Sequence, residues 1–209
     1  MSTDQQWDIV TGVGLTALAV AAGRAAETNR SDALMTDPYA SRLVAAAQPS
    51  APFPVSADSA GTSGIDDDLW ISASDYVGLR SRVFDDFFLR ASADGITQVV
   101  ILASGLDTRP YRLSWPSGTV CFELDQPAVL DFKSEVLKEE GATPGCDHRL
   151  IPIDLRQDWG AALEAAGFDA SRPTAWLAEG LLPYLPPEAE IQLLQEVSRL
   201  SAPGTRFAV

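Results

Sequence analysis

The chain has 209 residues, a hydrophobic content of 46% and a formal net charge of −14 at pH 7. This length allows one domain with a sizeable core, and the negative charge repels phosphate backbones and anionic lipids, so neither nucleic acid nor a membrane is an expected partner. The sequence contains two cysteines and one histidine, which predicts neither a zinc site nor a disulfide scaffold and is simplest to place in a reducing cytoplasm.

Residues 1–92 are predicted to form an N-terminal helical segment. Residues 11–23 are apolar but too few to span a bilayer, and acidic residues precede them where a signal peptide has basic ones, so they predict an amphipathic or buried helix. A second helix is predicted from Asp37, an N-cap residue that Pro38 follows. Residues 49–68 are rich in Pro, Ser, Gly and Asp, which predicts a flexible loop.

A long helix over residues 69–91 is predicted to complete this segment. Its apolar residues recur every three or four positions, and this spacing predicts that they face the core. These residues are Tyr76, Leu79, Val83, Phe87 and Ala91. The pattern changes after Asp94, so residues 93–209 are predicted to form a second unit.

Residues 93–209 alternate between apolar runs and amphipathic stretches. Strands are predicted at 97–104, 119–125, 149–154, 174–179 and 205–209. The stretches between them predict helices at 126–141, 158–168 and 186–204, the last with Ile191, Leu194, Val197 and Leu200 facing inward. This alternation indicates an α/β fold, a parallel sheet with helices on both faces.

Ligands of such sheets bind outside the carboxyl ends of the strands. Four of these ends are candidates, and in three of them a carboxylate is the last residue of the predicted strand. They are Ala103–Asp107, Glu123–Asp125, Asp154–Leu155 and Glu179–Gly180.

The first strand end reads A-S-G-L-D-T and so lacks two of the three glycines of a dinucleotide fingerprint. Asp107 would also place negative charge where a pyrophosphate should lie, which counts against NAD or FAD. S-adenosyl-L-methionine (SAM) has no phosphate, and Gly105 permits the close backbone approach that its adenosine needs.

The second strand end offers a ribose site. Asp125 follows Gly105 by twenty residues, about the separation at which an acidic residue accepts hydrogen bonds from ribose hydroxyls. Glu123 points to the same face and is the rival candidate. The alternative for either carboxylate is a salt bridge to Arg109 or Arg112.

Several stretches resemble SAM-dependent methyltransferases related to leucine carboxyl methyltransferases. They are VVILASGLDTRPYRL, FELDQPAVLDFK, IPIDL and WLAEGLLPYL, with TDPYASRLV and LRSRVFDDFF upstream. The resemblance implies a class I (Rossmann-like) methyltransferase fold, which is a three-layer α/β sandwich of seven strands, the last antiparallel, with an N-terminal helical segment. It also implies that SAM is the cofactor.

The resemblance implies a role for seven residues in holding SAM. Arg80, with Arg82 as the near alternative, would pair with the methionine carboxylate. Ala103 and Gly105 would form the loop under the cofactor, and Asp125 would bind the ribose. The remaining positions are Asp154 and Leu155 beside the adenine and Glu179 near the methionine ammonium group.

Structural alternatives exist for these residues. Asp154 could only cap the next turn, and Glu179 could only bind local backbone N–H groups. Asp107 and Arg109 are predicted to lock the loop as an ion pair. Tyr184 could face the substrate or the core. The lone histidine, His148, is predicted to be a loop residue and not a base.

The activity that the resemblance implies is O-methylation of a carboxylate on a small molecule or peptide. Such an acceptor is already ionised, so no general base is needed. The chain stops inside the fifth strand, which predicts missing C-terminal strands, an open sheet edge and an incomplete acceptor pocket. Two alternatives stay open: a methyltransferase-fold remnant without activity, and a nicotinamide-dependent oxidoreductase, which the missing glycines and Asp107 disfavour.

Overall fold

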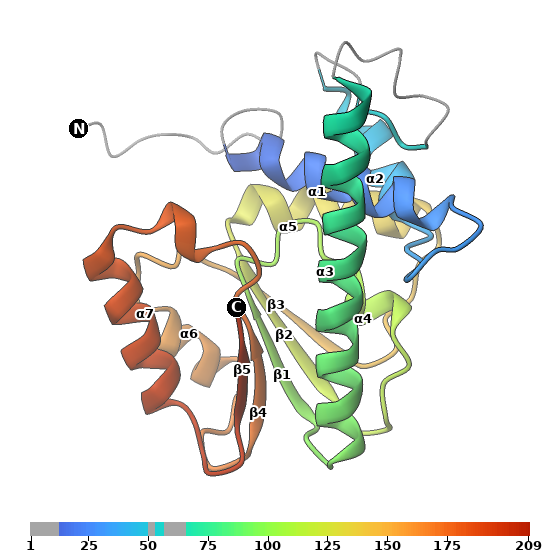
Figure 1. Ribbon diagram of the computed structural model, residues 1–209. Coiled ribbons are helices and arrows are strands. Elements are labelled where there is room, and N and C mark those ends of the chain that lie inside the picture. Colours follow the sequence, from blue (N-terminus) through green and yellow to red (C-terminus); the bar gives the residue numbers. More distant parts are fainter. Residues whose placement is uncertain (1–12, 50–52, 57–65) are drawn as a thin grey trace.

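The computed structural model describes residues 13–49, 53–56 and 66–209, and Figure 1 shows their layered arrangement. One sheet contains the strands β1 (Gln98–Leu102), β2 (Val120–Asp125), β3 (Asp147–Pro152), β4 (Thr174–Leu177) and β5 (Arg206–Ala208). Every pairing is parallel, and the order across the sheet is β3-β2-β1-β4-β5. Each predicted strand is present.

Helices cover both faces of this sheet (Figure 1). They are α1 (Val13–Thr28), α2 (Ala40–Ala47), α3 (Asp67–Ala93), α4 (Arg109–Arg112), α5 (Pro127–Glu139), α6 (Trp159–Ala165) and α7 (Pro187–Arg199), with a 3-10 turn at Leu182–Tyr184. Val100 and Leu102 of β1 join a core with residues of α6 and α7, while Val99 and Ile101 join a core with α3. The predicted three-layer α/β fold is therefore confirmed.

Helices α1 and α2 lie over the carboxyl ends of the strands, while α3 runs along one face of the sheet (Figure 1). Leu18 of α1, Leu43 of α2 and Trp70 of α3 pack in one cluster with Leu106, which belongs to the loop after β1. This cluster places α1 directly above the strand ends where a ligand is expected. The division of the chain at residue 92, and the flexibility of residues 49–68, most of which lie outside the described part, stay predictions.

The predicted buried face of α3 is wrong for most of its residues. Tyr76, Leu79 and Val83 are 61%, 54% and 55% exposed, although Ala91 is buried as expected. The helix instead buries a neighbouring face on which large apolar residues alternate with small and polar ones. The apolar residues include Trp70, Val77, Phe84 and Phe88, and the others include Ser74, Gly78, Ser81 and Asp85. A Cβ on Gly78 would lie 2.7 Å from the Glu27 side chain of α1, so the close contact between the two helices requires a glycine on this face.

Two further helix predictions need correction. Val197 and Leu200 at the end of α7 are buried, but Ile191 and Leu194 are exposed because the helix presents Leu193 to the core instead. The second helix begins at Ala40, three residues after its predicted cap. Asp37 lies in the turn before the helix, where its Oδ1 accepts from Tyr39 N at 3.0 Å and its Oδ2 accepts from Arg24 Nε at 2.8 Å.

Candidate functional site

A cavity of about 300 Å³ lies at the carboxyl ends of β1 and β4, under α1. These two strands are neighbours, and the strand order reverses between them, which is where parallel α/β sheets bind ligands. The lining contains five of the seven predicted site residues, Arg80, Ala103, Gly105, Asp125 and Glu179. The other lining residues are Thr16, Ala17, Val20, Arg24, Ile101, Leu102, Ser104, Leu106, Asp107, Gly180, Leu181, Pro183 and Tyr184.

The loop after β1 forms the floor of this cavity in a left-handed backbone conformation. Ala103 has a φ of 49° and Gly105 a φ of 51°. A Cβ on Gly105 would have room, with Ala17 Cβ 3.7 Å away, so the glycine serves the backbone conformation more than the space. Ala103 occupies a conformation that alanine rarely adopts.

We expect Ala103→Gly to raise the free energy of unfolding by about 0.5 to 1 kcal/mol. The left-handed conformation costs alanine about 1–2 kcal/mol, and the greater freedom of glycine in the unfolded chain offsets part of that gain. Urea denaturation measures the change. The control is Ala142→Gly, in a loop position outside the left-handed region, which should lose stability. A loss at both positions would show that Ala103 is not strained.

Asp125, at the end of β2, holds this loop from below. Its Oδ2 accepts a hydrogen bond from Gly105 N at 2.6 Å, and its Oδ1 accepts one from Gln126 N at 2.7 Å. Burial raises the pKa of Asp125, although the two N–H donors and the charge of Lys133 act in the opposite direction. Each carboxylate oxygen keeps one lone pair, so Asp125 can still accept hydrogen bonds from a ligand in the cavity.

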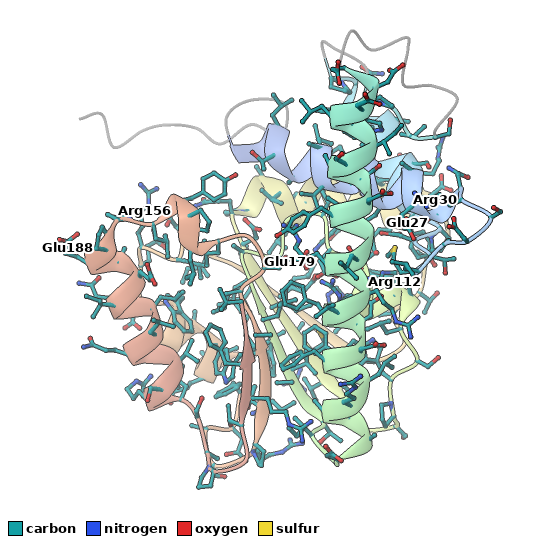
Figure 2. All side chains as sticks on the ribbon, in the orientation of Figure 1. Glu27, Arg30, Arg112, Arg156, Glu179 and Glu188 are labelled. Atoms are coloured by element: carbon teal, nitrogen blue, oxygen red, sulfur yellow. The ribbon has the colours of Figure 1, made fainter. Side chains whose placement is uncertain are left out.

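Three arginines and three carboxylates form a largely buried network beside the cavity. They are Arg80, Arg109, Arg112, Asp85, Asp107 and Glu179. Glu179 accepts from Arg80 Nε at 2.8 Å and from Arg109 Nη1 at 2.8 Å, and Figure 2 shows it at the carboxyl end of the sheet beside α3. Arg109 also binds Asp85 and Asp107. The predicted ion pair between Asp107 and Arg109 is therefore present. Glu179 binds side chains, and not the local backbone N–H groups considered as its alternative.

The charges in this network fix its protonation. Burial alone would raise the pKa of Asp107, but the nearby charges of Arg109 and Arg112 outweigh it and hold that pKa below its usual value. The pKa of Arg109 is raised, since burial opposes its charge less than Asp107, Glu179 and Asp85 favour it. Asp107 and Arg109 are thus ionised at neutral pH.

The structure separates the two arginine candidates on α3. Arg80 lines the cavity and donates to Glu179 through its Nε, so its terminal nitrogens can donate to a ligand. Arg82 points outward, where it binds Asp86 and the carbonyl oxygen of Leu34. Tyr184 lines the cavity and is half exposed, so it is not a core residue.

Asp154 and Leu155 lie outside the cavity lining. The side chain of Arg156, and to a smaller extent its backbone N–H, donates hydrogen bonds that hold the pKa of Asp154 well below its usual value. Leu155 packs against the core on the α6 and α7 side. The Asp154 carboxylate also accepts from Arg156 N at 2.8 Å, as its capping alternative requires. A role of the two residues beside the adenine stays a prediction.

Glu123 and His148 differ from their predicted surroundings. Glu123 is fully buried and binds Lys133 and His148, and neither it nor Asp125 pairs with Arg109 or Arg112. His148 lies within β3 and not in a loop, because that strand begins at Asp147. Sequence reasoning also missed Arg24, a buried cavity residue whose only signal was its place as a lone cation in an apolar helix.

This arrangement is a Rossmann-like α/β fold whose cavity, at the switch point of the sheet, contains a buried carboxylate after β2. The sequence profile described as leucine carboxyl methyltransferase matches residues 17–198. The chain therefore belongs to the leucine carboxyl methyltransferase family, and SAM is the cofactor of these methyltransferases.

Curated relatives match along nearly the whole chain. A "Putative S-adenosyl-L-methionine-dependent methyltransferase" of Saccharopolyspora erythraea is 56% identical over 209 residues, which are 100% of this chain and 71% of that protein. A protein of the same name from Mycobacteroides abscessus is 51% identical, and the match covers 100% of this chain and 66% of that protein.

A solved structure supports the fold. The "putative methyltransferase" of Thermobifida fusca has a TM-score of 0.52 and 22% identity, and the match covers 90% of this chain and 64% of that chain. The present chain thus spans about two thirds of the length of the proteins that it matches. Within the described residues, no helix is long and apolar enough to cross a membrane.

Proposed function

We propose that this protein transfers a methyl group from SAM to a carboxylate of a small molecule or peptide. When bound, SAM supplies a methyl group attached to a positively charged sulfur. Arg80, Ala103, Gly105, Asp125 and Glu179 would hold it, with Asp154 and Leu155 as the predicted adenine contacts. The cavity fits this zwitterionic ligand because arginine and carboxylate side chains both line it.

The observation that carries the proposed acceptor is the lack of a free base in the described cavity lining. No histidine, lysine or cysteine belongs to it. Asp107 pairs with Arg109 and Glu179 with two arginines, while Asp125 accepts from backbone N–H groups and would use its remaining lone pairs for the ribose. An alcohol or amine acceptor would need a group to take its proton, whereas a carboxylate is ionised at neutral pH.

The chain's own residues would then act by positioning. The transfer cancels the sulfur charge and the carboxylate charge, so no new anion needs stabilisation. The rate would come from holding the acceptor oxygen in line with the methyl carbon and from excluding water. The α1 residues Thr16, Ala17 and Val20 supply an apolar roof for this purpose.

Transfer of tritiated methyl groups from SAM tests this function. The acceptors are a panel of aliphatic and aromatic acids and peptides with free C-termini, with the matching amides as controls. We expect label on the acids only, and its release as methanol in mild base, because methyl esters hydrolyse there and methyl ethers and amines do not. Base-stable label, or equal labelling of the amides, would contradict a carboxylate acceptor.

A further inference from the structure

Ser104 occupies the middle of the loop that lines the cavity, between the two left-handed residues. Its backbone is fixed on both sides, since Ser104 N donates to Leu124 O at 3.1 Å and Ser104 O accepts from Asp107 N at 2.8 Å. Its side-chain Oγ lies 3.2 Å from Lys133 Nζ. The hydroxyl therefore has one defined neighbour and a fixed attachment.

The direction of this hydrogen bond follows from the chemistry of lysine. An ammonium group has three donors and no acceptor, so Ser104 Oγ must accept from Lys133. The hydroxyl proton must then point elsewhere. Within the described part of the chain, no acceptor for it lies within hydrogen-bond distance, and Ser104 is itself a cavity residue. The O–H group is thus available to a ligand.

Lys133 is buried in an ion pair and does not line the cavity, so it does not contact a ligand there directly. Its side chain on α5 is 1% exposed, and its Nζ lies 2.9 Å from Glu123 Oε1. The other oxygen of Glu123 lies 2.7 Å from His148 Nε2, and the Tyr111 ring packs edge-on against the imidazole at 5.3 Å. A buried ion pair whose carboxylate oxygens are both bound is rigid, because separating it leaves an uncompensated charge.

We propose that Ser104 donates its hydroxyl to the amino-acid carboxylate of the cofactor, and that Lys133 is the positioning residue that directs it there. This inference rests on the proposed function. A donor suits the anionic end of the cofactor, whereas Asp125, an acceptor, suits the ribose hydroxyls. The positive charge of Lys133 behind the oxygen polarises the hydroxyl and strengthens its bond to an anion.

Calorimetric titration with two ligands distinguishes contacts to the amino-acid end of the cofactor from contacts to its nucleoside end. S-adenosylhomocysteine carries the amino-acid group, and 5′-methylthioadenosine keeps the nucleoside and sulfur but lacks that group. We expect Ser104→Ala and Lys133→Met each to weaken S-adenosylhomocysteine binding about tenfold. Binding of methylthioadenosine should change less than about twofold, and the double variant should bind no worse than the weaker single variant.

The controls are Ser117→Ala and Lys138→Met, exposed residues of the same types, the second on the same helix. An equal loss for both ligands would mean that Ser104 and Lys133 only support the loop, and no loss would mean that the hydroxyl binds nothing; either result overturns the inference. Ser104→Ala leaves the Lys133–Glu123 pair intact, so it decides the question even where Lys133→Met fails to fold. A wild-type chain that binds neither ligand would instead overturn the proposed function.

Discussion

Asp125→Ala is expected to weaken S-adenosylhomocysteine binding at least about a hundredfold. The carboxylate would accept from two ribose hydroxyls, and each hydrogen bond to a charged group is worth about 1.5–3 kcal/mol. The substitution also releases Gly105 N, which Asp125 Oδ2 holds at 2.6 Å, so the loop under the cofactor loses a support at the same time. Calorimetric titration, with circular dichroism to confirm folding, measures the effect.

Asp131→Ala is the matched control, because Asp131 is an exposed carboxylate on the neighbouring helix α5 and should leave affinity unchanged. Asp125→Asn refines the result, since an amide can satisfy one of the two backbone donors but must point a donor of its own at the other. It should bind weakly as well. Affinity for S-adenosylhomocysteine within threefold of wild type in Asp125→Ala would remove Asp125 from the ribose site.

As the pH is lowered, the wild-type chain should lose affinity for S-adenosylhomocysteine at a higher pH than an exposed aspartate would cause. Burial raises the pKa of Asp125, so in the free protein the carboxylate takes up a proton at a higher pH than usual. The protonated group accepts hydrogen bonds less well, and ligand binding favours the ionised form. Affinity is therefore full well above this raised pKa and is lost as the pH falls through it. Asp125→Ala should show no such titration.

The elements of the sheet could be predicted because short, largely apolar segments alternate with amphipathic stretches and turn residues. Their register and the buried face of α3 could not. In α3, the periodic apolar residues Tyr76, Leu79 and Val83 point outward, whereas Asp85 points inward to Arg109 and Arg112. The helix carries a second apolar stripe with Trp70, Phe84 and Phe88, and periodicity alone does not show which of two stripes packs on the core. The buried face is also selected by its ion pairs and its close contact with α1.

The part of the site formed by two consecutive strand ends was predictable, because their separation along the chain is typical of neighbouring strands. Asp125 and Gly105, twenty residues apart, are joined by a hydrogen bond, as a strand, helix and strand of ordinary length require. The partners of Glu179 were not predictable, because Arg80 and Arg109 lie 99 and 70 residues away. Nor did any local signal pair Glu123 with Lys133 and His148. Such contacts depend on the packing of whole elements.

Arg109→Met is expected to destabilise the fold by about 3–5 kcal/mol. The guanidinium is 3% exposed and binds three carboxylates, Asp85, Asp107 and Glu179. Methionine fills a similar volume but leaves these negative charges close together in a buried place, and breaking buried pairs in this way costs about that amount. Unfolding in urea measures the loss. It is a large share of the roughly 5–15 kcal/mol that holds a domain of this kind together.

The dependence of this loss on pH separates charge from packing. In the wild type, the lowered pKa of Asp107 gives stability that is present above the ordinary aspartate pKa and lost only as the pH falls through the lowered value. Without Arg109, the clustered carboxylates bind protons more readily in the folded than in the unfolded chain, so lower pH favours the folded variant. The deficit should therefore be largest at pH 7 and shrink toward about pH 5.

Arg156→Met, which removes an exposed arginine from a carboxylate, should cost under about 1 kcal/mol. A deficit that stays constant with pH would mean that Arg109 stabilises the fold through its packing on Phe84 rather than its charge.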